Sequence, residues 1–485
     1  MNVPSIFVGA AIRGCAMSTL PAADAWAMTD FTGAELGDAR RTQRLVELAT
    51  VFAQRPGASL PEACGNRARL KAASRCFDHE AVDPQAILES HVMATSDRLA
   101  AVSRVLAVQD TTAVDWPAHP ATTGLGPLAA PTHQGLHVHT TLALTPERLP
   151  VGRLAQQVWA RDPAAVGTRT TRQHRPIADK ESQKWLTSVA AVREAHARCP
   201  PTRFVCVGDR EADVYDLFRQ ERPSGVDLLV RAAWNRRVDH PERDLWTKVA
   251  AQPVVATLTV RVPRRGPQPA RQATVAVRWC LVLRCPPTHR QAEKLPATAV
   301  WVVQAVEEQP PARGEPLEWV LLTTCAVHTR ADAVERVDWY ACRWGLEVWQ
   351  TVLKSGCRLE ARPLDTADRL RRCLAVYSVL AWRLLYTTMV SRAMPDAPCT
   401  AVLEPEAWQA LDCAIHLTPT PPSTPPPLRQ AVPWIGRLGG FLARRGDAEP
   451  GVTVLWKGFQ HLTDLTRMYR IMHPAFPKRK NVGKA

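Results

Sequence analysis

The sequence predicts a mixed α/β protein with helical units at both ends. Two observations indicate this fold class. Through the middle of the chain, short apolar runs alternate with helical periodicity in the order strand, strand, strand, helix, strand, helix, strand. The flanking segments 1–95 and 431–485 read as mostly helical. Such an order favours one mixed sheet layered with helices.

The central elements follow from local composition. The strand candidates are apolar or alternating runs at 104–110, 135–144, 151–160, 202–209 and 226–234. The helix candidates between them are 179–199 and 210–222. In the first of these helices Trp185, Val189 and Val192 lie on one side, which predicts a face packed against the sheet.

The second half of the chain departs from this order. Residues 235–325 carry alternating valines between Pro and Gly turns, which predicts an inserted antiparallel β unit. A helix over 331–356 and an apolar helix around 366–393 then return to the core. We therefore divide the chain into a helical unit (1–95), a core (96–400, with its insertion at about 235–325), a proline-rich linker (401–430) and a helical C-terminal unit (431–485).

Composition narrows the partners and the compartment. The formal net charge of +15 favours a polyanionic partner, most simply nucleic acid. The 13 cysteines include no CxxC pair, so reduced thiols of a cytosolic protein are indicated rather than a zinc site. The apolar run 373–390 approaches the length of a membrane span, but Arg383 lies inside it. We expect a buried helix of a cytoplasmic protein that contacts no membrane.

Three acidic residues are candidates for chemistry. Asp110 and Asp209 each end an apolar run, and strand ends open onto the face where α/β proteins build sites. Glu347 lies on the predicted helix 331–356. Three converging carboxylates repel one another unless a cation joins them, and hard oxygen ligands suit Mg²⁺ or Mn²⁺. Two such ions can bind the attacking and leaving oxygens of a phosphoryl displacement, so the pattern outlines a nucleotidyl-transfer site.

The helix that carries Glu347 also carries a tyrosine and two basic residues on the same stripe. At about 100° per residue, the four side chains fall in a sector roughly 60° wide. They are Tyr340, Arg343, Glu347 and Lys354. A solvent-facing ionic stripe would have the same geometry, so the partners of Glu347 decide between the two interpretations. Beside the acids, these side chains would hold a phosphodiester backbone by charge and hydrogen bonding.

These residues resemble the signature of a known family. The spacing Y-(2)-R-(3)-E-(6)-K is met without a gap at 340–354, the stretch D-R-E-A-D at 209–213, and the first acid, followed by two threonines, at Asp110. Further matching stretches are "LGDARRTQRL", "KESQKW", "EPLEWVLLT" and "LGGFLARR". The chain resembles the insertion-sequence-4 family of bacterial DDE transposases and is similar to the transposase of transposon five.

The resemblance implies a ribonuclease H-like catalytic core interrupted by the β-rich insertion. It further implies an N-terminal unit that recognises transposon ends and a C-terminal unit that mediates homodimerisation on DNA. The reaction would be cut-and-paste transposition. Water nicks one strand, the freed 3′-hydroxyl forms a hairpin on the opposite strand, a second hydrolysis opens the hairpin, and the 3′-ends are joined to target DNA. Asp110, Asp209 and Glu347 would be the catalytic residues and hold two Mg²⁺ ions, for which Mn²⁺ can substitute.

Further residues are matched to DNA contacts through the same resemblance. Trp319 would receive a base flipped out at the hairpin, and Trp344 lies near the same distortion. Arg210 and Arg231 match basic residues that contact DNA. Positions that recognise the transposon end correspond to Arg40, Arg41, Arg44 and Arg75. One departure is Thr351, which stands where the transposon-five enzyme has a lysine.

Two other functions fit parts of the pattern. A nuclease with a similar core would cut DNA without rejoining it, but Trp319 and the Tyr/Arg/Lys stripe argue for the hairpin step. A DNA-binding repressor of transposition would do no chemistry. Such a protein gains little from three clustered negative charges facing a polyanion. Both alternatives are open to a direct assay of end joining.

Overall fold

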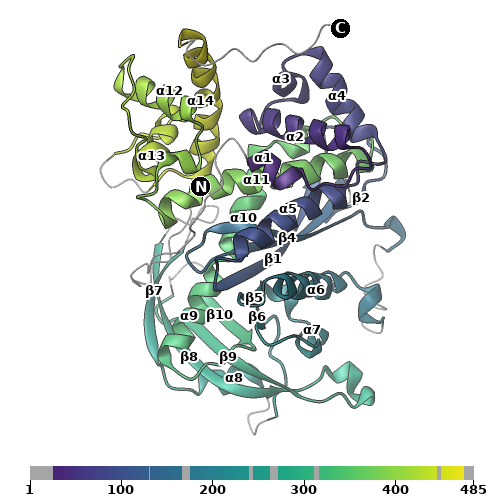
Figure 1. Cartoon of the computed structure of the whole chain (residues 1–485). Helices are drawn as coiled ribbons and strands as arrows, with labels where there is room; N and C mark the ends of the chain where they lie inside the picture. Colours follow the sequence, from purple (N-terminus) through teal and green to yellow (C-terminus); the bar gives the residue numbers. More distant parts are fainter. Residues whose placement is uncertain are drawn as a thin grey trace.

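The structure is a computed structural model that describes residues 26–129, 132–165, 175–239, 244–262, 271–310, 316–444 and 449–473. One large mixed sheet runs through the molecule, with helices on its faces and further helices at both ends of the chain (Figure 1). The strand order is β2-β3-β1-β5-β6-β10-β9-β8-β7, and β4 pairs with β3. The predicted mixed α/β class is confirmed.

The first half of the sheet has the predicted order of strands. The antiparallel strands are β1 (Arg104–Asp115), β2 (Gly126–Pro127), β3 (Gln134–Leu144) and β4 (Pro150–Trp159). The parallel neighbours of β1 are β5 (Arg203–Gly208) and β6 (Val226–Arg231). Apart from the two-residue β2, three antiparallel strands joined to two parallel ones are consistent with a ribonuclease H-like core.

The β-rich insertion extends this sheet rather than forming a separate unit. Its strands are β7 (Ala256–Val262), β8 (Arg271–Arg284), β9 (Thr298–Glu307) and β10 (Glu318–Thr323), and α8 (Leu245–Ala250) precedes them. They are antiparallel, as predicted, but β10 also pairs with β6, with Leu322 opposite Val230. This pairing covers a core strand that would otherwise present unpaired backbone groups at the sheet edge.

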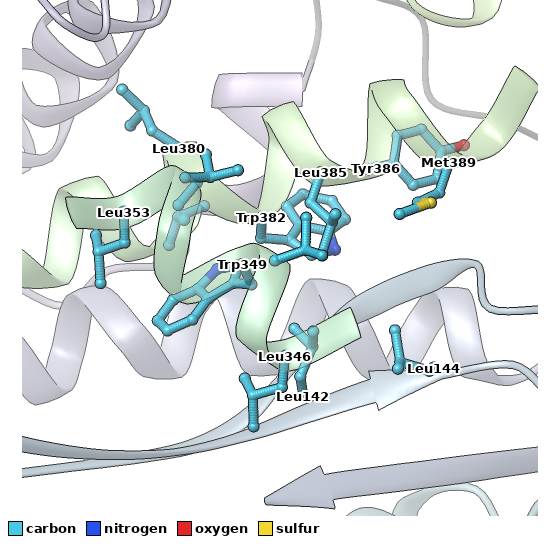
Figure 2. Close-up of a cluster of buried hydrophobic side chains, with 14 of the residues drawn as sticks. Leu142, Leu144, Leu346, Trp349, Leu353, Leu380, Trp382, Leu385, Tyr386 and Met389 are labelled. Carbon is cyan, nitrogen blue, oxygen red and sulfur yellow. The ribbon is translucent and has the colours of Figure 1, made fainter. Parts of the chain in front are cut away.

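Alternating side chains of β1 reach two hydrophobic cores. Val105 and Ala107 join the core under α6 (Gln183–Arg198), whereas Leu106 and Val108 face the other core. That second core includes residues from α9 (Arg330–Ala341), α10 (Trp344–Thr351) and α11 (Ala367–Ala393). Figure 2 shows α10 between the strand residue Leu142 and side chains of α11.

Helix α11 is the apolar helix predicted around 366–393. Among the described residues it is the one helix long and apolar enough to cross a membrane, yet 94% of its most apolar window is buried in the protein. The indole N–H of Trp382 on α11 donates to the Pro150 carbonyl at 2.9 Å. Helix α11 is therefore a core helix. The cysteines among the described residues are free thiols.

The N-terminal unit consists of short helices with side-chain caps. They are α1 (Trp26–Phe31), α2 (Ala39–Gln54), α3 (Leu60–Cys64) and α4 (Arg67–Asp78). Asp38, Ser59 and Asn66 each accept a backbone N–H at the start of a helix. The next helix, α5 (Pro84–Leu99), packs on β4 and so belongs to the core.

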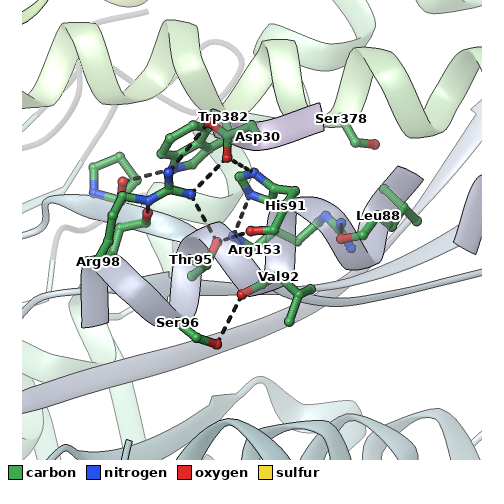
Figure 3. Close-up of polar contacts among 12 residues, drawn as sticks. Asp30, Leu88, His91, Val92, Thr95, Ser96, Arg98, Arg153, Ser378 and Trp382 are labelled. Carbon is green, nitrogen blue, oxygen red and sulfur yellow. Dashed lines mark hydrogen bonds and ion pairs between the residues drawn. The ribbon is translucent and has the colours of Figure 1, made fainter. Parts of the chain in front are cut away.

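A buried polar network fastens α1 to that core (Figure 3). His91 of α5 donates from Nδ1 to Asp30 over 2.6 Å, and its Nε2 accepts the Arg153 backbone N–H at 3.0 Å. Arg98 donates to Asp30 at 3.0 Å and to the Val151 carbonyl at 2.8 Å. This donor and acceptor pattern requires a neutral imidazole. Burial lowers the pKa of His91 to about 4 despite the opposing charge of Asp30.

The C-terminal helices are α12 (Pro405–His416), α13 (Leu428–Leu438) and α14 (Val452–Met472). Helix α12 lies inside the range 401–430 assigned to a linker, so irregular proline-rich chain is restricted to 417–427. The prolines that break helical structure lie after residue 416. The segment before them forms a regular helix, because Pro405 lies in its first turn, where proline is tolerated.

Short single turns complete the secondary structure. They are α7 (Tyr215–Arg219), η1 (Pro163–Ala165), η3 (Ile177–Asp179), η4 (Arg210–Ala212), η5 (Thr288–Glu293), η6 (Val352–Gly356), η7 (Leu359–Ala361) and η8 (Cys399–Ala401). The predicted helix 210–222 is therefore reduced to η4 and α7.

Candidate active site

The two aspartates come together because their strands are parallel neighbours. Val108 of β1 is paired with Val207 of β5. Asp110 lies two residues further along β1, and Asp209 is the first residue after the end of β5. Adjacent strands are about 4.8 Å apart, so Asp110 and Asp209 lie side by side. The predicted strand ends at residue 110, whereas β1 continues to Asp115 through its pairing with β3. Asp110 thus marks the point where β1 parts from β5 rather than the end of the strand.

Asp209 is fixed by a tight turn after β5. Its carboxylate accepts the Glu211 backbone N–H at 2.9 Å and so caps η4. The preceding Gly208 makes this turn possible, because a Cβ at this position would lie 2.5 Å from the Ala212 Cβ. Asp213, at the end of the same motif, is buried and accepts hydrogen bonds from Arg284 at 2.8 Å and from the Ala233 backbone at 2.9 Å. The buried pair therefore anchors the turn to β8.

The segment predicted as one helix over 331–356 is divided in the structure. Helix α9 ends at Ala341 and α10 begins at Trp344. Between them the backbone forms hydrogen bonds to the residue three positions earlier, as in a 3-10 turn. The Arg343 N–H donates to the Tyr340 carbonyl at 3.1 Å, and the Leu346 N–H donates to the Arg343 carbonyl at 3.0 Å. After Thr351 the helix widens into the π-helical turn η6. A tightened turn places Arg343 directly beneath Tyr340.

Close packing accounts for both irregular turns. A Cβ on Gly345 would lie 3.0 Å from a methyl group of Leu144 on β3, so this glycine lets α10 approach the sheet. A Cβ on Gly356 would lie 2.8 Å from the Trp456 ring of α14. Tertiary contacts of this kind override the regular periodicity that the sequence suggests.

Glu347 and Asp110 meet at a shared partner. Arg343 donates from Nη1 to Asp110 at 3.1 Å and from Nη2 to Glu347. The side chains of Arg343 and Asp110 are 20% and 18% exposed, and that of Glu347 is 29% exposed, so the group is reachable from solvent. The partner of Glu347 is thus Arg343 of the same stripe, and Arg343 links this stripe to Asp110 on β1.

The electrostatics place all three acids within one field. Burial raises the pKa of Asp110 to about 6; Arg343 opposes the rise, and the charges of Asp209 and Glu347 add to it. Burial also raises the pKa of Asp209. For Arg343, burial alone would lower the pKa, but the surrounding Tyr340 and acidic groups outweigh it and hold the pKa above its ordinary value. The positive charge that offsets the acids in this arrangement is that of Arg343.

Two aromatic residues and two arginines border the acids. Trp319 of β10 contacts Tyr340 edge to face, with ring centroids 5.2 Å apart, and is only partly buried. Arg231 at the end of β6 donates to the Glu318 carbonyl at 2.7 Å. Burial raises the pKa of Tyr340, and the positive charge of Arg231 opposes this rise. Arg210 follows Asp209 and is exposed. These predicted DNA contacts therefore gather at one end of the sheet.

The remaining predicted residues lie further from the acids. Trp344 begins α10 and is partly buried against the core. Lys354 lies on η6, where its Nζ is 3.9 Å from a Glu360 carboxylate oxygen. The Thr351 hydroxyl donates to the Glu347 carbonyl at 2.9 Å, so the departure from the family pattern is absorbed by the helix.

The four N-terminal arginines belong to a separate surface. Arg40 and Arg44 are exposed on α2 and pair with Asp38 and Glu47, whereas Arg75 is exposed on α4. Arg41 instead donates to the Leu36 carbonyl at 2.9 Å and so stabilises the start of α2. Helix α11 packs against α2 and α4 on one side and β4 on another, so it lies between the N-terminal helices and the core sheet. The four arginines therefore do not belong to the acidic cluster.

Two polar contacts beside the acids were not among the predicted site residues. Lys184 of α6 donates to Glu211 at 2.9 Å, and its charge lowers the pKa of Asp209 against the larger effect of burial. Thr111 is hydrogen-bonded to His139 Nδ1 at 2.9 Å across the β1–β3 pair. The facing stretches "QDTT" and "HVHTT", both polar within buried strands, were the available signal.

The donor set suits a hard divalent cation, since it offers carboxylate oxygens alone. Within the described residues, however, no three His, Cys, Asp or Glu side chains are grouped so that they could share a metal ion. Arg343 holds one oxygen of Asp110 and one of Glu347. The carboxylates are thus of the right chemical type for such an ion, and the Arg343 guanidinium occupies the space between Asp110 and Glu347.

Comparison with known families bears on the two ends of the chain. A model described as transposase DNA-binding matches residues 23–82, and a model described as the transposase Tn5 dimerisation domain matches residues 379–473. Together they indicate a Tn5-type transposase. The matches also support DNA binding and formation of a homodimer, and a DNA-binding protein with α11 in its core agrees with the expected cytoplasmic location.

The matched ranges can be compared with the helices. The DNA-binding match covers α1 to α4 and ends before α5, which packs on the core. The dimerisation match begins within α11 and includes α12, α13 and α14. The acids lie between the two matched ranges.

Proposed function

We propose that this Tn5-type transposase belongs to the insertion-sequence-4 family and performs cut-and-paste transposition with Asp110, Asp209 and Glu347. The observation that supports the proposal is the placement of these acids: the strands that lead to Asp110 and Asp209 are parallel neighbours, and Arg343 joins Asp110 to Glu347. Transposase DNA-binding and dimerisation domains flank them in the same chain. The proposed partners are the inverted transposon ends and a target duplex.

The three carboxylates would hold two Mg²⁺ ions, replaceable by Mn²⁺, which when bound supply positive charge to the attacking and leaving oxygens. The chain's own residues position the DNA. Tyr340 and Arg343 present a hydroxyl and a guanidinium next to the acids, where a phosphate oxygen can accept from both. Lys354, Arg210 and Arg231 add positive charge along the path of the strand.

Trp319 suits the hairpin step. Its ring is partly buried and packs against Tyr340, whose charge environment includes Asp209, so Trp319 would lie close enough to the acids to receive an extruded base. Trp344, one residue beyond Arg343, would support the same distortion. Nicking, hairpin formation, hairpin opening and strand transfer are the same in-line phosphoryl displacement with different nucleophiles, so one site serves all four. The exposed arginines Arg40, Arg44 and Arg75, with Arg41, would contact the transposon end.

A joining assay tests the proposal. The substrate is a duplex that carries the DNA flanking the coding region, incubated with a target plasmid and Mg²⁺. Wild-type protein is expected to cut the end and join it, whereas Asp209→Ala and Glu347→Gln keep end binding and lose both reactions. Glu335→Gln is the matched control, because Glu335 pairs with Arg104 on the outer side of α9.

The alternatives give different products. Cutting without joined plasmid would identify a nuclease that lacks strand transfer. Binding of the ends without any cutting by the wild-type protein would identify a repressor. Either result overturns the proposal.

A further inference from the structure

Arg343 is shared by two of the candidate ligands. Its two terminal nitrogens donate to Asp110 on β1 and to Glu347 on α10, so one guanidinium bridges acids from separate elements. The fork geometry of a guanidinium suits two carboxylate oxygens held this way. Arg343 lies at the tightened turn between α9 and α10, and this turn directs it toward the acids.

A divalent ion between the same acids would need the same oxygen lone pairs. The oxygens that accept from Arg343 are Asp110 Oδ2 and Glu347 Oε1. A cation bound there would also meet the positive charge of the guanidinium at close range. Metal and Arg343 therefore compete for one position.

A DNA phosphate could draw Arg343 away. Phosphate is the other strong bidentate partner of guanidinium, and Arg343 lies beneath Tyr340 on the side where Trp319 and Arg231 gather. The Arg343 Nε–H is buried and finds no hydrogen-bond acceptor within the described part of the chain. The present arrangement thus leaves one donor of the guanidinium unsatisfied, which lowers the cost of rearrangement.

We propose that Arg343 acts as an internal counter-cation that withholds Asp110 and Glu347 from metal until a DNA phosphate takes its guanidinium. The inference rests on the proposed function, since it concerns the same metal site. Its consequence is linkage: DNA raises the affinity for metal, and metal raises the affinity for DNA by the same factor. The protein free of DNA would then be a weak metal binder and a poor non-specific nuclease.

The test is Mn²⁺ binding to the DNA-free protein, followed by the electron paramagnetic resonance of free Mn²⁺. Arg343→Gln is expected to bind Mn²⁺ about 10-fold more tightly than wild type, a typical coupling between two sites. Arg104→Gln is the matched control, because it removes one positive charge from β1, the strand that carries Asp110, at a residue that pairs with Glu335 and not with the three acids. The control should change the affinity far less. Adding an end duplex should tighten Mn²⁺ binding in wild type and have little effect in Arg343→Gln.

The outcomes separate this inference from the proposed function. If Arg343→Gln binds Mn²⁺ no more tightly than wild type while wild type still cuts and joins DNA, the guanidinium merely orients the acids and the inference fails alone. If Asp110→Asn leaves Mn²⁺ binding unchanged in both backgrounds, the ion lies elsewhere and both proposals fail. Arg343→Lys, which keeps the charge but cannot span both acids, should give an intermediate affinity. Thermal melting of each variant checks that it is folded.

Discussion

At the scale of single residues, two side chains of the same type can have different roles near the site, because their exposure and their partners differ. Trp349 and Trp319 are both tryptophans on the elements that carry the site. Trp349 is fully buried and donates to the Ser378 carbonyl at 3.3 Å, whereas Trp319 is only partly buried and packs against Tyr340. The first is a core residue, and the second is partly accessible to a partner from outside the chain.

Replacing Trp319 should therefore affect one step more than the others. In Trp319→Ala the stacking of an extruded base, about 1–3 kcal/mol, is lost, so hairpin formation should slow by roughly one to two orders of magnitude. The first nick needs no flipped base and should persist. Denaturing gels that resolve nicked from hairpin DNA measure both steps.

Trp319→Phe is the control for this change, since it keeps an aromatic face and should retain most hairpin formation. If nicking and hairpin formation fall together in Trp319→Ala, the residue supports the fold of the site and receives no base.

At the scale of elements, sequence periodicity predicted the core strands and the long apolar helix, because buried strands and amphipathic helices repeat regularly. Asp110, Asp209 and Glu347 could be proposed from their positions in such elements. Three features could not be foreseen. The insertion joins the core sheet through β10, the helix with Glu347 tightens at Arg343 and widens at η6, and α12 forms within the expected linker. Each depends on contacts between distant segments, such as that of Gly345 with Leu144.

The turn after β5 offers a test of how an element positions an acid. In Gly208→Ala the new Cβ would stand 2.5 Å from the Ala212 Cβ, so η4 must move and carry Asp209 with it. Overpacking of this kind costs about 1–3 kcal/mol, and the cleavage rate should fall by more than the loss of stability accounts for. Calorimetry and single-turnover cleavage measure the two effects.

The double variant Gly208→Ala/Ala212→Gly removes the methyl group that causes the clash and should recover part of the lost rate. A double variant no better than the single one would contradict this explanation and assign the defect to residue 208 itself, through its flexibility or through the Trp185 ring, which would lie 3.2 Å from the new Cβ.

At the scale of the whole molecule, the DNA-binding unit contacts the rest of the chain at several places, among them its packing against α11 and the two sets of contacts described next. Asp30 of α1 is buried against α5 through His91 and Arg98 (Figure 3). On the other side, the Thr463 hydroxyl of α14 donates to the Gln54 carbonyl of α2 at 2.9 Å, and Arg55 pairs with Asp464. The matched DNA-binding and dimerisation regions thus contact each other as well as the core.

The His91 network predicts how this organisation responds to acid. The folded pKa of His91 is about 4, below its ordinary 6.5, so between these values the unfolded chain binds a proton that the folded chain does not. The stabilisation is full above pH 6.5 and is lost as the pH falls toward 4. Asp30, whose pKa is lowered against the effect of burial by His91 and Arg98, adds a loss of the same sign at still lower pH. The free energy of unfolding should fall by up to a few kcal/mol across this window.

A variant isolates the contribution of His91 from that of other buried histidines. His139, whose pKa burial lowers to about 3, produces an acid loss of the same sign, so the expected result is a difference between two proteins. His91→Gln can donate to Asp30 and accept from Arg153 without titrating, and its melting temperature should fall less than that of wild type between pH 7 and pH 4.5. Equal losses in both proteins would show that the imidazole is not what acid disrupts. Because His91 lies where α1 meets the core, a smaller loss in the variant would identify this junction as the acid-sensitive part of the molecule.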